Sequence, residues 1–117
     1  MAIISSHTLN GLNGSHAGGI FVSLKNLHNN ENIFETLIDV GGRLNEFVPD
    51  EKINENVVYE LVFKSGEYWD KIINDKNYKN IIQEIVIRFK MPDKKKKYHF
   101  PIILSPNSYS TWWSKGE

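Results

Sequence analysis

Near its C-terminal end the chain reads YHFPIIL, from Tyr98 to Leu104. In an extended strand every second side chain lies on the same face, and one face here carries Tyr98, Phe100, Ile102 and Leu104. His99 and Ile103 point to the opposite face. Because a strand with one apolar face packs that face against a core, the pattern predicts a half-buried β-strand.

The same alternation recurs through the rest of the chain. The clearest further strands run over Val57 to Lys64, Ile81 to Lys90 and Ile20 to Leu24. Weaker candidates, rich in β-branched and aromatic residues, are Ile3 to Leu9, Ile33 to Val40 and Tyr109 to Trp113. Turn residues separate these runs. The four lysines Lys94 to Lys97 are expected to form the polar tip of a hairpin, which keeps a sheet edge from pairing.

One stretch follows a helical period instead. Its apolar residues recur at helical spacing after Ser65, which is expected to cap a short helix at about 66–75. Seven or eight short strands with one helix predict an all-β protein. A β-sandwich is favoured and a barrel is the alternative. The length of 117 residues fits a single domain, 1–117.

Composition narrows the function classes. Lys plus Arg is 14 and Asp plus Glu is 14, so the formal net charge is zero; this argues against a nucleic-acid or membrane-surface binder. The chain has no cysteine, which excludes disulfides, thiolate metal sites and thiol nucleophiles. The sequence shows no signal-peptide pattern and no apolar run long enough to span a bilayer. A cytoplasmic protein is therefore expected.

Four histidines and one arginine are the candidates for chemistry. His16 and His28 lie in loops and are interpreted as solvent-exposed residues, whereas His7 and His99 lie in predicted strands. His99 faces away from the predicted core, which suits either solvent or a site, and spacing alone favours an ordinary histidine. Arg43 follows two glycines. Its residue type suits bidentate recognition of carboxylates and urate-like anions, although a surface arginine in a turn is more common.

The C-terminal region adds two tryptophans. In a strand, Trp112 and Trp113 point to opposite sides, so one is expected to pack inward while the other forms an interface or ligand surface. No metal-ligand spacing, phosphate loop or serine nucleophile elbow is present in the sequence, and no metal site is expected.

Four segments combine into a recognisable pattern. In chain order they are Ser6-His7-Thr8-Leu9-Asn10, Asp39-Val40-Gly41-Gly42-Arg43-Leu44, Tyr59-Glu60-Leu61-Val62-Phe63, and Tyr98 to Pro106 followed by Tyr109-Ser110-Thr111. They resemble four segments of the 5-hydroxyisourate hydrolases, the transthyretin-related proteins. The first three resemble that family's opening strand, its Asp-x-x-Gly-Arg turn and the strand before its helix. The fourth resembles its C-terminal signature, Tyr-His-x-Pro-(apolar)-Leu-Ser-Pro-x-x-Tyr-Ser-Thr. The resemblance covers nearly the whole chain in order.

The resemblance implies a transthyretin-like β-sandwich of two four-stranded sheets with one short helix. It also implies a homotetramer, in which subunits pair through their last strands and stack around a channel that holds the active sites. His7, Arg43 and His99 match the family's catalytic residues, and Arg43 also anchors the substrate. The implied reaction is the ring-opening hydrolysis of 5-hydroxyisourate, a product of urate oxidation, with no cofactor or metal. The zero net charge predicts no nucleic-acid or membrane partner.

The last residues depart from the family. Its enzymes end in Tyr-Arg-Gly-Ser directly after Ser-Thr, and this chain continues with Trp112-Trp113-Ser114-Lys115. Trp112 can still stack on a flat ring, and Lys115 can supply a cation to a substrate or belong to a solvated tail. The alternatives to a 5-hydroxyisourate hydrolase are a hydrolase of the same fold that acts on another heterocycle, and a non-catalytic binder of a small aromatic or acidic ligand.

Overall fold

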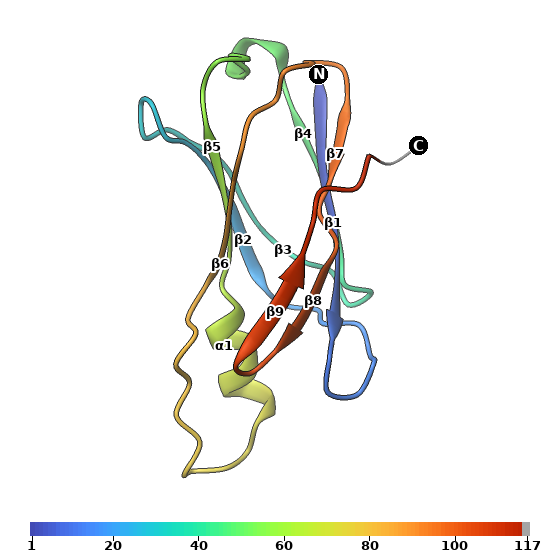
Figure 1. Cartoon of the computed structure of the whole chain (residues 1–117), viewed down its shortest axis with the longest axis vertical. Coiled ribbons are helices and arrows are strands. Elements are labelled where there is room, and N and C mark those ends of the chain that lie inside the picture. Colours follow the sequence, from blue (N-terminus) through green and yellow to red (C-terminus); the bar gives the residue numbers. More distant parts are fainter. Residues whose placement is uncertain (116–117) are drawn as a thin grey trace.

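Two β-sheets pack face to face in the computed structural model, which describes residues 1–115 (Figure 1). One sheet has the strand order β4-β1-β8-β9, with β7 also paired to β1, and the other has the order β3-β2-β5-β6. The strands are β1 (Ala2–Asn10), β2 (Phe21–Asn26), β3 (Asn32–Leu37), β4 (Arg43–Val48), β5 (Tyr59–Phe63), β6 (Ile85–Phe89), β7 (Lys97–His99), β8 (Ile102–Ser105) and β9 (Ser108–Thr111). The predicted all-β sandwich is confirmed.

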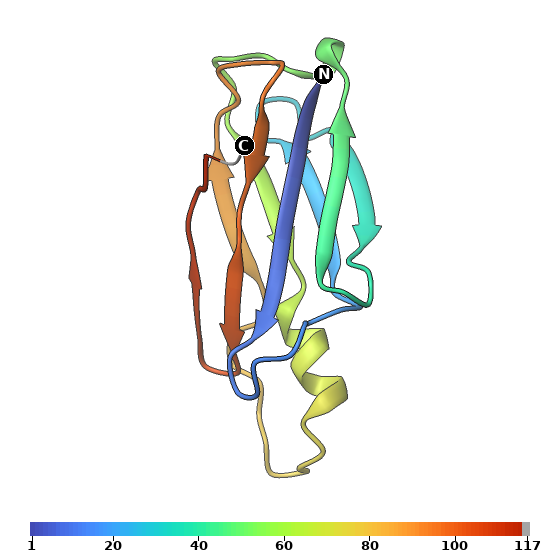
Figure 2. The same cartoon turned by 90° about the vertical axis from the view of Figure 1, so that its right-hand side faces the viewer.

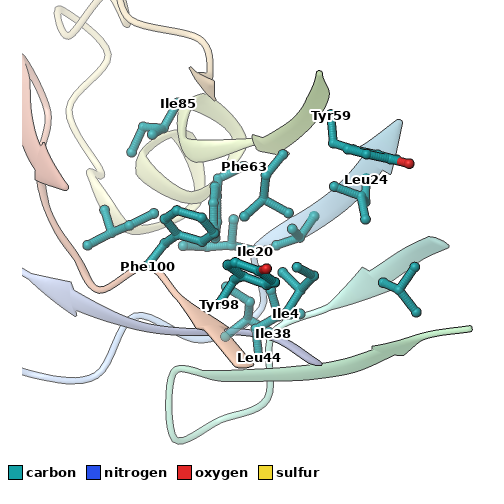
Figure 3. Packing of buried hydrophobic residues seen from close by; sticks show 14 of the residues in the cluster. Ile4, Ile20, Leu24, Ile38, Leu44, Tyr59, Phe63, Ile85, Tyr98 and Phe100 are labelled. Atoms are coloured by element: carbon teal, nitrogen blue, oxygen red, sulfur yellow. The ribbon is translucent and has the colours of Figure 1, made fainter. Parts of the chain in front are cut away.

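The core lies between the two sheets (Figure 3). The apolar face of the 98–104 segment is buried there, namely Tyr98, Phe100, Ile102 and Leu104. They pack with apolar residues of the opposite sheet, including Leu24, Leu61, Phe63 and Ile85. Because burial of a large apolar side chain contributes roughly 1.5–3 kcal/mol, this layer supplies the main drive to fold.

The sheet that contains β1 has five strands rather than the four that were expected. Pro101 divides the predicted strand at 98–104 into β7 and β8, because proline has no N–H to give to a ladder. Both pieces run parallel to β1, β7 beside its first half and β8 beside its second half. At the break, the buried Ser6 hydroxyl donates to the Phe100 carbonyl at 2.6 Å.

The sequence pattern does not predict strand β4, and Arg43 was expected in a turn. It pairs antiparallel with β1, and Arg43 lies directly opposite His7. Only Leu44 and Val48 of this strand are buried, and Phe47 is exposed on the outer face. Without a regular inward set of apolar residues, the strand carries no alternating signal.

Helix α1 (Ser65–Ile72) lies at one end of the sandwich and is shorter than the predicted 66–75. The predicted cap is wrong: Lys64 occupies the cap position, and the buried Ser65 hydroxyl has no hydrogen-bond partner within residues 1–115. The Gly66 N–H donates instead to the Gln83 carbonyl at 2.9 Å. This bond ties the helix start to the irregular segment before Ile85, where a strand had been expected from Ile81.

A 3-10 helix and a lysine-rich loop lie among the connections between strands. A 3-10 helix, η1 (Asp50–Lys52), precedes β5. The lysine-rich loop at 94–97 was expected to be a hairpin tip, but it crosses from β6 in one sheet to β7 in the other. Within residues 1–115 the single α-helix is too short and too polar to cross a bilayer.

Candidate functional site

Three candidate residues lie on neighbouring strands of one sheet. β1 runs between β4 and β7 (Figure 2). His7 pairs with Arg43 of β4, and Ser5 pairs with His99 of β7. Residues two apart in a strand, and residues directly opposite across a ladder, share a face. The register therefore brings His7, Arg43 and His99 to the same outer face of the sandwich.

A glycine turn places Arg43 at the start of its strand. Gly42 has a φ of +74°, which favours glycine. A Cβ atom there would lie 2.6 Å from the Thr8 carbonyl oxygen. The Thr8 N–H in turn donates to the Gly42 carbonyl at 2.8 Å. The turn between β3 and β4 therefore fits closely against β1, one residue from His7.

His99 is held through one ring nitrogen. Its Nδ1 lies 2.8 Å from the hydroxyl oxygen of Ser5, a side chain that is only 3% exposed. The Ser114 N–H donates to the His99 carbonyl at 2.8 Å and forms an isolated bridge. The half-buried imidazole therefore keeps Nε2 for other partners, while the C-terminal segment is tied back to the site.

His7 is held through the opposite nitrogen. Its Nε2 lies 2.9 Å from Nδ1 of His16, and the two ring centroids are 5.0 Å apart. His16 is exposed, as expected, but its contact with His7 was missed. The two residues lie nine positions apart on either side of a Gly-rich turn. The available signal was the turn chemistry of Asn10 to Gly14, which folds the chain back onto β1.

Both imidazoles are biased toward the neutral form. Burial is the main cause that lowers the pKa of His7, followed by the charges of Arg43 and His16. Burial likewise lowers the pKa of His99 first, followed by the charges of Lys97, Arg43 and His7. An unperturbed histidine titrates at about 6.5. Because both values lie below it, both rings are mainly neutral at pH 7 and able to accept a proton.

Arg43 presents its guanidinium to solvent. Its backbone N–H donates to Oδ1 of Asp39 at 2.9 Å, which closes the turn. Among residues 1–115, no ion pair includes the guanidinium of Arg43. An exposed guanidinium beside two neutral imidazoles is suited to bind a planar anion through paired hydrogen bonds.

The C-terminal residues only partly follow the sequence analysis. Trp112 and Trp113 are 49% and 54% exposed, so neither packs fully inward. Trp113 borders a shallow apolar groove with Phe89 and Tyr98. Trp112 lies between the end of β9 and Ser114, which pairs with His99. Lys115 is exposed, and no hydrogen bond or ion pair joins it to the described part of the chain.

We searched the surroundings of His7, Arg43 and His99 for a metal-ligating cluster and for an enclosed pocket. No group of three or more metal-ligating side chains gathers within residues 1–115. One hollow in the described part of the chain lies elsewhere, beside Phe21, Glu35 and Lys64 on the other sheet. The site residues therefore line an open sheet face.

The chain has relatives of known name. The HIUase/Transthyretin family matches it over residues 4–114. It is 29% identical over 114 residues to the 5-hydroxyisourate hydrolase of Pseudomonas aeruginosa. The alignment covers 96% of this chain and 90% of that protein.

Solved structures agree on the fold. The Klebsiella pneumoniae 5-hydroxyisourate hydrolase matches with a TM-score of 0.78 and 21% identity, over 97% of this chain and 99% of that one. An (S)-allantoin synthase matches with a TM-score of 0.82 and 23% identity, over 97% of this chain but only 43% of that longer one. At these identities the structural likeness supports the architecture.

Proposed function

The chain belongs to the HIUase/transthyretin family, and from this premise we propose that it hydrolyses 5-hydroxyisourate in the breakdown of urate. The observation that carries the proposal is the register of three adjacent strands, which brings His7, Arg43 and His99 to one face. Two neutral imidazoles beside a guanidinium combine a proton acceptor with an anchor for an acidic ring.

The hydrogen bonds distinguish the two histidines. In the tautomer where Nδ1–H of His99 donates to the hydroxyl oxygen of Ser5, Nε2 carries the lone pair that takes a proton. The Nε2 atom of His7 is occupied by His16. We therefore assign His99 as the general base, and we assign His7 to positioning the water and the substrate beside it.

The reaction adds one water across a ring amide bond. As the water oxygen bonds to the ring carbonyl carbon, Nε2 of His99 takes one water proton, and the carbonyl oxygen becomes an oxyanion. Collapse of the oxyanion breaks the carbon–nitrogen bond. The imidazolium of His99 returns its proton to the departing ring nitrogen. The base is thereby regenerated, and the ring opens with the elements of water added.

Arg43 binds the substrate in this proposal. The acidic ring carries negative charge that a guanidinium can pair through two parallel hydrogen bonds, and this pairing fixes the ring next to the base. Trp112 supplies an aromatic surface for stacking. Lys115 supplies a second cation from the segment that the Ser114–His99 pairing brings back to the site.

The proposal includes a homotetramer in the cytoplasm. The outer face around the site carries exposed apolar side chains, among them Phe47 at 58% and Ile103 at 42%. Such patches are typical of protein interfaces. β6 and β9 are both edge strands, and they lie on the same side of the sandwich (Figure 2). Pairing through these edges, followed by stacking of the outer faces, would enclose the open site.

The test is the decay of 5-hydroxyisourate, made from urate by urate oxidase and followed by its ultraviolet absorbance. We expect the wild-type protein to accelerate the decay beyond its spontaneous rate. A decay that is unchanged by the protein contradicts the proposal. That outcome would favour the alternatives, another heterocyclic substrate or a non-catalytic binder.

A further inference from the structure

A third histidine is fixed against the site by backbone hydrogen bonds. The Ala17 N–H donates to the Thr8 carbonyl at 2.9 Å, and the Asn10 N–H donates to the Ser15 carbonyl at 2.8 Å. These two bonds lie on either side of His16 and hold its backbone along β1. The backbone of His16 is therefore fixed next to β1, although its side chain is exposed to solvent.

The turn before β4 packs against the same residue. A Cβ atom on Gly42 would lie 3.4 Å from Cβ of His16, which is van der Waals contact. His16 thus lies between β1, which carries His7, and the turn that leads to Arg43. From this place its Nδ1 reaches Nε2 of His7 at 2.9 Å.

The proton positions in this pair follow from its neighbours. The backbone carbonyl of Gly41 raises the pKa of His7, because an acceptor beside the ring favours the protonated form. A neutral imidazole has a single N–H. If His7 gives its N–H to Gly41, its Nε2 has only a lone pair. The 2.9 Å contact then requires the Nδ1–H of His16 to be the donor.

We propose that His16 is a positioning residue of the hydrolytic site, and that its Nδ1–H holds Nε2 of His7 as an acceptor in one tautomer and one orientation. This inference rests on the proposed function, in which His7 positions water and substrate beside His99. His16 touches His7 and acts on the reaction through it.

The charges around His7 set the direction of the pH effect. His7 faces Arg43 from β4, His99 from β7, His16 from the loop and Asp39 from the turn. Asp39 is the one negative group among these four. The charge of His16 is one of the causes that lower the pKa of His7. Removal of His16 should therefore raise the pKa of His7. His7 would then become protonated at a higher pH, and activity would be lost at a higher pH on acidification.

Two substitutions separate this role from a general structural one. His16→Ala removes the donor. His16→Asn keeps an N–H donor at nearly the same reach, because the amide nitrogen of asparagine occupies the position of Nδ1. His28→Ala is the matched control, since His28 is an exposed histidine in the turn after β2, on the other sheet.

The experiment combines ¹⁵N-NMR of the histidine rings with a pH profile of kcat/KM for 5-hydroxyisourate. We expect one dominant tautomer of His7 in the wild-type, His16→Asn and His28→Ala proteins. In His16→Ala we expect mixed tautomers and a kcat/KM about 10-fold lower. We also expect the acidic limb of its profile at higher pH. His16→Asn should recover most of the rate.

The inference is overturned if His7 has the same tautomer and the same titration in His16→Ala as in the wild type. It is also overturned if His16→Asn loses as much activity as His16→Ala. The NMR measurement needs no substrate. A failure of the proposed function would therefore appear separately, as a wild-type protein without activity but with an intact His7–His16 hydrogen bond.

Discussion

The two strand histidines differ in which ring nitrogen the protein occupies. Ser5 takes Nδ1 of His99, and His16 takes Nε2 of His7. A neutral histidine that donates from one ring nitrogen has a lone pair on the other, and Nε2 of His99 is the ring nitrogen that no neighbour occupies in this pair of contacts. Because Ser5 is buried, the bond that it makes to His99 is shielded from water. This difference is the reason for assigning the base to His99.

The sequence predicted part of this arrangement. Alternation alone predicted that His99 faces away from the core, because its neighbours Tyr98 and Phe100 are apolar. The contact partners Ser5 and His16 were not predictable in this way. Ser5 approaches His99 from 94 positions away, through a parallel strand pairing that no local pattern encodes. His16 depends on how tightly one turn folds back.

The titration of these histidines gives a pH prediction. The pKa values of His7 and His99 are both lowered, so the neutral rings that the mechanism needs persist below the ordinary histidine value of about 6.5. We expect kcat/KM for 5-hydroxyisourate to be level across neutral pH and to fall only on acidification below about 6.5. A pH–rate profile checks this. A decline that begins above pH 7 would contradict the neutral-base assignment.

At the level of strands and turns, the sequence predicted apolar faces well and interruptions poorly. The buried face of the 98–104 segment and that of β5 follow from alternation. The break at Pro101 was missed because the apolar pattern continues through it. β4 was missed because Phe47 points outward and because Asn45 and Glu46 at the middle of the strand are polar, so no apolar alternation is visible. Both failures concern the strands that carry Arg43 and His99.

The turn before β4 gives a prediction about stability. Gly42→Ala forces a left-handed backbone on alanine, which costs about 1–2 kcal/mol, and also places its Cβ 2.6 Å from the Thr8 carbonyl oxygen. Gly14→Ala is the matched control, because Gly14 has a φ of +76° and a Cβ there meets nothing within 4 Å. We expect urea unfolding to show a larger loss for Gly42→Ala.

The same pair of variants tests the position of Arg43. Because Gly42 adjoins Arg43, Gly42→Ala should also raise KM for 5-hydroxyisourate, while Gly14→Ala should leave it unchanged. Equal losses of unfolding free energy in the two variants would mean that the turn does not depend on its close fit against β1.

At the scale of the whole molecule, the open sheet face points to a second copy of the chain. A small substrate is usually buried in a concave site, whereas the residues around His7 lie on an open face with apolar neighbours. Ile103 lies on that face in β8, one strand from the outer edge. Covering the face in a dimer of dimers would bury both the apolar side chains and the site.

This gives a prediction about assembly. Ile103→Glu places a charge on the face that a second dimer would cover, so we expect the mass from light scattering to fall from a tetramer to a dimer, with a parallel loss of activity. Ile81→Glu is the control, because Ile81 is 74% exposed in the irregular segment before β6. A wild-type protein that is monomeric at micromolar concentration would contradict the proposed assembly.

In the proposed mechanism, His99 and Arg43 act together on one bound substrate. The most direct measurement is the initial rate of 5-hydroxyisourate decay with His99→Ala and Arg43→Glu, beside His28→Ala and Lys79→Glu as matched controls at exposed positions. We predict that His99→Ala lowers kcat/KM by about 10²- to 10⁴-fold. Loss of the charged hydrogen bonds of Arg43 should lower it by at least about 10-fold. The two controls should keep the wild-type rate. Wild-type activity that survives in both site variants would contradict the account.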